Sequence, residues 1–200
     1  MSRLNPLAVS ALALLAERPM HPYEMYQLML QRREDRVVKV SAGSLYRAVE
    51  RLAADGDIAE SGVEREGNRP ERTVYTITAS GRDALRSTLE QMLGEFVNEF
   101  PEFPVAIGEA HNLPPERVAD LLDERAARIR DFADLLDTGL RHIAAKGVAR
   151  YRVLNVHYTR AMVAAELDWL ERTIAELRDG ELTWAAPEQL AAASADPIRT

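Results

Sequence analysis

The sequence contains no cysteine and few aromatic residues. Without cysteine the chain has neither a disulfide framework nor a thiolate metal site. Aromatic residues make up 6% of the 200 residues, whereas alanine and leucine are abundant, and this composition favours helix over sheet. Because 46% of the residues are hydrophobic, the chain can bury one substantial core or two small ones.

The sequence also lacks the motifs of common enzyme classes. It has no HExxH motif, no cysteine nucleophile and no glycine-rich phosphate loop. The four histidines are scattered, at His21, His111, His142 and His157. The pair Asp123 and Glu124 stands among arginines, which is typical of a solvated helix face. The sequence therefore predicts a protein that is not an enzyme and that needs no cofactor and no metal.

No apolar run is long enough to span a bilayer. The charged start followed by the apolar run Leu7–Ala16 permits two interpretations, a signal peptide or a first core helix. Pro6 after the potential cap Asn5, together with helical spacing of the apolar residues that follow, favours the helix. We therefore expect residues 6–17 to begin a cytoplasmic domain with no membrane partner.

The net charge of −7 is unevenly distributed along the chain. Residues 1–80 hold 11 Lys and Arg against 11 Asp and Glu, which leaves 14 against 21 for residues 81–200. An acidic protein is not the usual partner of nucleic acid. Because the whole deficit lies in the second part, the first part remains free to approach a polyanion.

The stretch 41–56, SAGSLYRAVERLAADG, predicts an amphipathic helix. Leu45, Val49 and Leu52 recur at helical spacing, either Ser41 or Gly43 caps the start, and Gly56 ends it. The residues on the other side or near the leading end are polar or cationic: Ser41, Gly43, Ser44, Tyr46, Arg47 and Arg51. A DNA major groove accepts such a helix end. For Tyr46 two roles stay open, packing at the edge of the core and contact with DNA.

The flanking segments predict a winged helix. A helix over 22–33, capped by His21, and an extended segment over 34–40 precede the stretch 41–56. Strands over 57–65 and 73–78 follow it, joined by a turn-rich tip. The cations of this hairpin are Arg65, Arg69 and Arg72. They serve either solubility or contact with phosphates and the minor groove, and we favour the second role beside a recognition helix.

These segments resemble the PadR family of bacterial transcriptional regulators. HPYEM, VSAGSLYRAVERLAADGDI and VYTITASGRDAL carry the resemblance over residues 7 to about 90, and ELDWLERTIAEL extends it loosely to about 178. The resemblance implies a homodimer, usually a repressor, whose operator affinity responds to a small molecule. It places recognition residues at Ser44, Tyr46 and Arg47, and wing residues at Asn68, Arg69 and Arg72. Arg47 stands where many members have proline, so its contacts need not follow the family's.

The remaining sequence predicts a helical C-terminal region. We expect a helix from the cap Thr78 to about Phe100, whose residues 81–100 link the winged domain to the rest. A short helix near 105–111 and two long helices, over 115–146 and from there to about 178, should follow. The tail over 181–200 should be loosely ordered, with Trp184 making a contact. Two long helices joined at Gly147 form an antiparallel pair. Their apolar surface exceeds what one pair can hide, so we expect a second copy to cover it. A dimer would set two recognition helices roughly 34 Å apart on a palindromic site.

One apolar stripe in this region has two alternative uses. Tyr151, Tyr158, Met162 and Trp169 suit a small aromatic or hydrophobic effector, with Arg152, His157 or Arg160 to orient an acid. Ordinary core and dimer packing is the other use.

Together the observations predict a mainly α fold with a small β-hairpin. Residues 1–80 form a winged helix-turn-helix domain and residues 101–180 a helical dimerisation region. The predicted function is regulation of transcription by binding double-stranded DNA. The rival hypothesis is a winged helix that contacts proteins, and it differs in lacking strong salt dependence of duplex binding.

Overall fold

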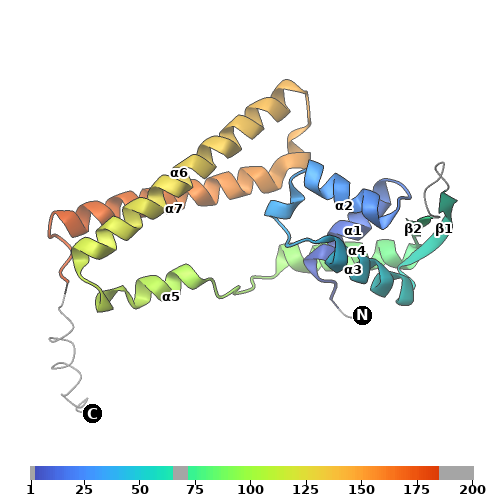
Figure 1. Ribbon diagram of the computed structural model, residues 1–200, viewed down its shortest axis with the longest axis horizontal. Coiled ribbons are helices and arrows are strands. Elements are labelled where there is room, and N and C mark those ends of the chain that lie inside the picture. The colour runs from blue at the N-terminus through green and yellow to red at the C-terminus, as the bar shows by residue number, and fades with distance from the viewer. Residues whose placement is uncertain (1–2, 65–71, 185–200) are drawn as a thin grey trace, which may run out of the picture. The chain divides into compact units, whose positions relative to one another are not determined.

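The computed structural model describes residues 3–64 and 72–184, and it divides the chain into two compact units, Met1–Asn98 and Glu99–Thr200. Each unit is described by itself. Helices dominate both units, and a two-stranded antiparallel hairpin lies in the first (Figure 1). The predicted mainly α fold with a small hairpin is confirmed.

The first two helices begin at prolines, as predicted. α1 spans Pro6–Glu17 and α2 spans Pro22–Gln31. The side chain of Asn5 accepts a hydrogen bond from the amide of Ala8 at 2.9 Å, and Nδ1 of His21 accepts one from the amide of Tyr23 at 3.0 Å. Proline has no amide hydrogen, so it fits the first position of a helix, where an amide would lack a partner. The side chain that precedes it accepts a hydrogen bond from another amide of the first turn.

The segment predicted as extended over 34–40 contains a turn of 3-10 helix, η1, at Glu34–Arg36. α2 ends two residues earlier than predicted, and Arg33 adopts the left-handed conformation at φ 60°. The prediction failed because it rested on valines that begin only at position 37. Val38 is buried in the core and Val40 packs against it, so these valines lead the chain into α3, Ala42–Ala54.

The hairpin pairs β1, Ile58–Glu64, with β2, Arg72–Ile77. Its register runs from Ile58 opposite Ile77 to Glu64 opposite Arg72, with an irregularity between Glu60 and Gly62. Met20 extends the pairing, since its amide and carbonyl both bond to those of Tyr75. The sequence predicted Thr73, Tyr75 and Ile77 on one face, whereas Val74 on the opposite face is also buried.

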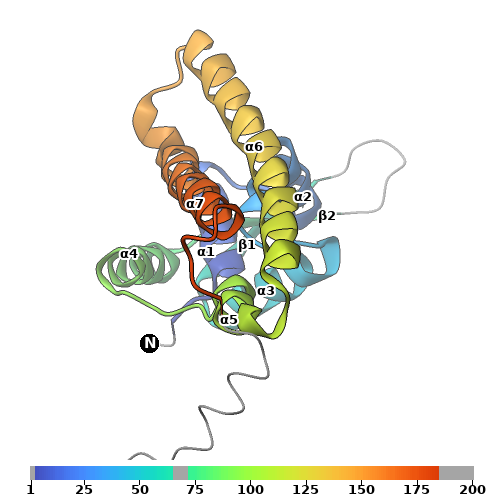
Figure 2. The same ribbon diagram turned by 90° about the vertical axis from the view of Figure 1, so that its left-hand side faces the viewer.

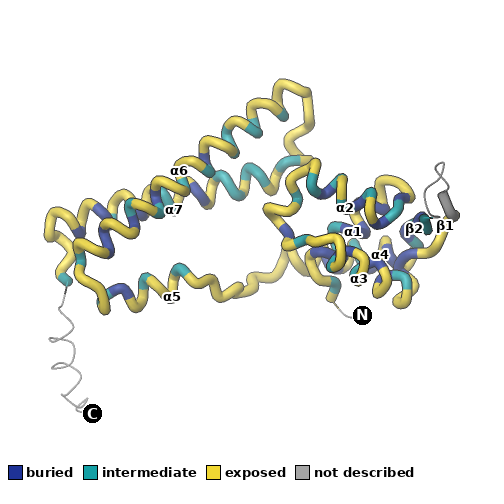
Figure 3. Tube along the Cα trace, in the orientation of Figure 1, coloured by how far each residue is buried: buried dark blue, intermediate teal, exposed yellow. Residues whose placement is uncertain are grey.

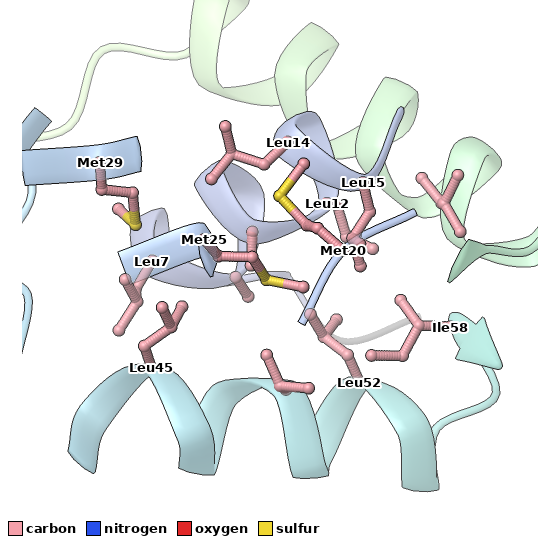
Figure 4. Packing of buried hydrophobic residues seen from close by; sticks show 14 of the residues in the cluster. Leu7, Leu12, Leu14, Leu15, Met20, Met25, Met29, Leu45, Leu52 and Ile58 are labelled. Atoms are coloured by element: carbon pink, nitrogen blue, oxygen red, sulfur yellow. The ribbon is translucent and has the colours of Figure 1, made fainter. Parts of the chain in front are cut away.

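One hydrophobic core holds the first unit together. Figure 4 shows Leu7 and Met25 lying toward Leu45 of α3, and Ile58 lying beside Leu52 of the same helix. Leu12, Met25 and Leu45 are completely buried. Each such side chain contributes about 1.5–3 kcal/mol when removed from water. The core therefore fixes one face of α3 and leaves the other in solvent.

α4, Ala79–Gly94, starts at the predicted cap Thr78. The hydroxyl of Thr78 accepts a hydrogen bond from the amide of Gly81 and lies within hydrogen-bond distance of the carbonyl of Gly56 at 2.8 Å. The helix was predicted to continue to about Phe100 but ends at Gly94, and Phe96 is 96% exposed. Glycine is a weak helix former, and a stripe with nothing to pack on does not sustain a helix.

The second unit is built on two long helices. α5, Glu102–Gly108, and η2, Ala110–Asn112, replace the short helix predicted near 105–111. α6 spans Pro115–Ala145 and α7 spans Leu154–Arg178, running antiparallel as predicted (Figures 1 and 2). They are not joined at one glycine: Gly147 at φ 69° is followed by η3, Arg150–Val153.

Small and aliphatic side chains pack α6 against α7, among them Ala126, Leu170 and Ile174, so buried positions alternate with exposed ones along both helices (Figure 3). Ion pairs join the helices beside this core: Arg125 with Glu166 at 2.6 Å, Arg130 with Glu171 at 3.1 Å, Arg160 with Asp137 at 2.8 Å and Arg178 with Asp123 at 3.1 Å. Nε1 of Trp184 donates to the carbonyl of Leu113 at 2.9 Å, which confirms its predicted contact. The rest of the predicted tail, 185–200, lies outside the described residues.

Candidate nucleic-acid interface

α3 presents a charged outer face. Leu45, Val49 and Leu52 are buried, as predicted, and the exposed side of the helix carries Arg47 and Arg51. Among the residues that the structure describes, no carboxylate lies within 4 Å of either guanidinium group. Two cations held on a rigid helix without protein partners are available to an external anion.

The start of α3 uses two of the predicted site residues for itself. The Ser41 hydroxyl accepts a hydrogen bond from the Ser44 amide at 3.1 Å, and the Ser44 hydroxyl accepts one from the Ser41 amide at 2.9 Å. This reciprocal capping box satisfies amides that a helix start otherwise leaves free. Their hydroxyls are thereby engaged within the chain, while Gly43 beside them is exposed and has open space where a side chain would stand.

Glu50 is a residue that the sequence analysis missed. It lies three residues after Arg47 and is therefore its neighbour on the helix surface. Its side chain is exposed, and no cation lies within 4 Å of it among the described residues. The sequence could have indicated it, because helical periodicity places position 50 on the side of the helix away from the buried stripe at 45, 49 and 52. The outer face is thus of mixed charge.

Tyr46 occupies the flank of α3 nearer the hairpin. It is 37% exposed, and its ring meets the ring of His21 edge-on at 6.1 Å between centroids. Tyr46 and Glu50 line a small hollow of about 190 Å³ together with residues of α2 and β2. One wall of the hollow is Arg72, whose guanidinium lies over the ring of Tyr23 at 5.4 Å. Tyr46 therefore has both a packing role and an exposed edge.

The other predicted wing residues, Arg65, Asn68 and Arg69, lie outside the described residues. Arg72 begins β2 and is half-buried. It joins the hairpin to the base of α2 rather than extending freely.

Tyr75 has a mainly structural role, as the sequence indicated. It is partly buried against the core, and its backbone pairs with Met20. Burial, together with the negative charges of Glu60 and Glu50, raises the pKa of Tyr75 above its ordinary value. Its hydroxyl therefore stays neutral and able to donate a hydrogen bond at physiological pH.

The predicted effector residues lie on the exposed side of the second unit. Tyr158 and Met162 share one face of α7 and are 68% and 54% exposed, and Tyr151 before the helix is 69% exposed. Trp169 meets the ring of Phe103 edge-on at 6.1 Å. Of the three polar partners, Arg160 is paired with Asp137, Arg152 donates to the hydroxyl of Tyr151, and His157 is half-buried. These side chains form a surface rather than an enclosed cavity.

A strong ion pair lies beside this surface. Two hydrogen bonds from the guanidinium of Arg160, at 2.8 and 3.1 Å, lower the pKa of the Asp137 carboxyl. The same contact raises the pKa of Arg160. Arg160 is therefore already occupied and is a poor partner for an acidic effector.

Residues 3–64 and 72–184 contain neither a metal-binding cluster nor a membrane span. No three His, Asp or Glu side chains gather there as a metal ion would require. None of the helices in those ranges has both the length and the apolar character of a membrane span.

A known protein family matches the first part of the chain. Residues 11–87 match the Transcriptional regulator PadR-like family. No curated protein shows significant sequence similarity to the chain.

Solved structures share the fold. Bacillus subtilis PadR in complex with operator DNA has 17% sequence identity and a TM-score of 0.75, covering 86% of this chain and 99% of that one. The same regulator with p-coumaric acid has 17% identity and a TM-score of 0.70, covering 86% and 98%. The Vibrio cholerae virulence activator AphA has 19% identity and a TM-score of 0.63, covering 86% and 98%. The resemblance predicted from the sequence is confirmed, since residues 11–87 match the PadR-like family of transcriptional regulators and the chain shares the fold of solved PadR structures.

Proposed function

We propose that this chain is a homodimeric transcriptional repressor that inserts α3 into the major groove of a pseudo-palindromic operator. The observation that carries the proposal is the division of α3 into a buried face and an outer face, whose two arginines have no carboxylate within 4 Å among the described residues. A helix with its side chains is about 10–12 Å across, which matches a major groove about 12 Å wide.

Arg47 is the residue best suited to read a base. It lies in the second turn of α3, is exposed, and has no carboxylate within 4 Å among the described residues. A guanidinium group donates two parallel hydrogen bonds to O6 and N7 of guanine, and such a contact contributes about 1–3 kcal/mol of discrimination. Arg51, one turn further along the helix, is better placed to reach phosphate.

A second copy of the chain is the proposed cover for the exposed face of α7. Leu154, Tyr158 and Met162 recur every four residues on that face and are each more than half exposed. Soluble proteins rarely leave such a stripe in water. A symmetric dimer buries it and duplicates the recognition helix, so that the operator has two half-sites roughly 34 Å apart.

The effector part of the proposal depends on the same surface. A small aromatic acid such as the p-coumaric acid bound by Bacillus subtilis PadR would find aromatic side chains there, including Tyr151 and Tyr158. Arg152 beside Tyr151 could orient its carboxylate. Binding that favours a dimer unable to span both half-sites would release the operator.

The test is selection of bound fragments from a random duplex pool, followed by titration of the selected duplex at several salt concentrations. A regulator is expected to enrich a palindromic site and to lose affinity steeply as salt rises. Arg47→Ala should cost about 1–3 kcal/mol and relax the preference at one position of each half-site. Arg86→Ala on α4, which removes the same charge, is the matched control.

Sedimentation at micromolar concentration should give twice the chain mass, and Tyr158→Asp should shift the protein toward monomer. A monomeric wild-type protein would contradict the prediction of a palindromic operator with two half-sites. Absence of duplex binding at low salt, combined with capture of a protein partner by α3, would support the rival protein-contact role.

A further inference from the structure

A broad hollow lies along the flank of α3 that faces away from the hairpin. It has a volume of about 630 Å³ and is bounded by residues 3–8 at the start of α1, by residues 37–39, and by one side of α3. We call it the α1–α3 hollow. Its cations are Arg3, Lys39, Arg47 and Arg51, and its carboxylate is Asp55.

Lys39 is held outward by its neighbours. Val38 is buried and Val40 packs against the same core, so the side chain between them points into solvent. No carboxylate lies within 4 Å of its ammonium group among the described residues, whereas Arg3 pairs with Glu95 at 3.6 Å. Among the described residues, the lining cations with no carboxylate within 4 Å are therefore Lys39, Arg47 and Arg51. Because Arg47 is proposed to read a base, Lys39 and Arg51 are left for the backbone.

The shape of duplex DNA gives this hollow a role. A helix in the major groove fills its width, so each flank of the helix meets one of the two phosphate backbones that wall the groove. On one flank of α3 lies the smaller hollow with Arg72, and on the other lies the α1–α3 hollow. The smaller hollow holds Arg72 beside Glu50, whereas the α1–α3 hollow holds four cations and one carboxylate, so the α1–α3 hollow is the more positive of the two surfaces.

We infer that the α1–α3 hollow receives the sugar-phosphate backbone of one operator strand, with Lys39 and Arg51 as its phosphate ligands. The inference rests on the proposed DNA-binding function and adds a sequence-independent anchor to it. Ammonium and guanidinium groups without protein partners neutralise phosphates at little desolvation cost, and the contact fixes the register of α3 without reading bases.

Asp55 leaves the Lys39 end of the hollow free of negative charge. It lies at the C-terminal end of α3, one turn after Arg51, whereas Lys39 precedes the N-terminal end, and the 13 residues of α3 span about 20 Å. The strand therefore crosses the hollow near Lys39 and meets Arg51 farther along the helix. The apolar part of the lining, which includes Leu4 and Leu7, suits the deoxyribose rings.

The first test is the salt dependence of binding to a random-sequence duplex. Each phosphate contact contributes about −0.9 to the slope of log affinity against log salt concentration. Lys39→Ala should flatten the slope by about 0.9 for each protomer bound, and Lys39→Arg should restore it. Arg86→Ala on α4 removes an equal charge outside the hollow and should leave the slope unchanged.

The second test locates the phosphate. Single methylphosphonate substitutions, which remove one backbone charge, are placed along each strand of a selected duplex. In each half-site, one such substitution should weaken the binding of the wild type. The same substitution should not further weaken the binding of the Lys39→Ala variant. This coupling identifies the phosphate that Lys39 contacts.

The outcomes separate this inference from the proposed function. If the wild type binds no duplex, the proposed function fails and the anchor fails with it. If the affinity of the wild type falls steeply as salt rises and the Lys39→Ala variant shows the same slope, only the anchor is overturned. A loss confined to one base position would show that Lys39 reads a base, and would also overturn it. Loss of inorganic phosphate binding by Lys39→Ala with unchanged duplex binding would assign the hollow to a small anion instead.

Discussion

The guanidinium group of Arg72 lies over the ring of Tyr23, with its central carbon 5.4 Å from the ring centroid. This contact joins the first residue of β2 to the first turn of α2. A cation–π contact at an exposed site contributes about 0.5–1 kcal/mol. Arg72 also lines the smaller hollow together with Tyr46 and Glu50 of α3, so the contact with Tyr23 keeps this cation close to α3.

Tyr23→Leu should therefore weaken duplex binding while changing stability by less than about 1 kcal/mol. The variant keeps apolar bulk at position 23 but releases the Arg72 side chain. Titration with the selected duplex and thermal unfolding measure the two effects. Arg72→Ala is the control, and Tyr23→Leu should add little in its presence. If Tyr23→Leu weakened duplex binding equally in the wild type and in the Arg72→Ala variant, Tyr23 would not act through Arg72.

The capping box gives a prediction for Ser44. Ser44→Ala should cost about 1 kcal/mol of unfolding free energy, comparable to Ser41→Ala, and leave base preference unchanged. The double variant should lose less than the sum, because each serine supports the same helix start. Chemical denaturation and duplex selection test this. A changed base preference with stability intact would assign Ser44 to the DNA instead.

Glu50 should contribute to base preference. A carboxylate accepts from the amino group of cytosine, whereas an amide pairs with adenine. Glu50→Gln is therefore expected to shift preference from cytosine to adenine at one position of each half-site, by about 1–3 kcal/mol. Binding to random duplex should also rise, since an anion is removed from the face. Glu90→Gln on α4 is the charge control. A uniform rise with no altered position would show that Glu50 reads no base.

Two glycines of α4 should respond oppositely to alanine. A Cβ at Gly81 would lie 2.0 Å from the carbonyl oxygen of Asp57, so the backbone must move, and we expect a loss of about 3 kcal/mol or more. A Cβ at Gly94 meets nothing within 4 Å, so Gly94→Ala should stabilise the helix end by about 0.5–1 kcal/mol. Denaturation of both variants measures this. Similar effects at the two positions would contradict the close approach at Asp57.

The Asp137–Arg160 pair predicts an acid-sensitive second unit. Because Arg160 lowers the pKa of Asp137 in the folded chain, the pair stabilises above the ordinary carboxyl pKa of 3.8. That stability is lost as the pH falls below 3.8. Asp137→Asn should therefore lower the denaturation midpoint at pH 7 more than at pH 2.5. Asp168→Asn, which removes an exposed pair with Arg172 on one helix, should show a smaller pH dependence.

The local features of this fold follow from short stretches of sequence. Asn5 and Pro6, His21 and Pro22, and the stripe at Leu45, Val49 and Leu52 each specify a helix start or a buried face. The interactions behind them join residues at most four apart, so they are legible without knowledge of the rest of the chain. The resemblance to the PadR family likewise depends on short motifs, and residues 11–87 match the PadR-like family.

Long-range packing decided the rest. The exposed position of Tyr158 and Met162 depends on which side of α7 meets α6, and helical periodicity alone allows either side. Val38 and Val40 turn Lys39 outward because they reach a core made by α1 and α2. The hollow beside Lys39 exists because the start of α1 comes to lie along α3, a meeting of segments some forty residues apart. Local sequence determined most helices and strands of this protein, whereas tertiary packing determined which of their faces remain open to a partner. The exposure of a side chain depends on residues that are distant in sequence and meet only when the chain folds.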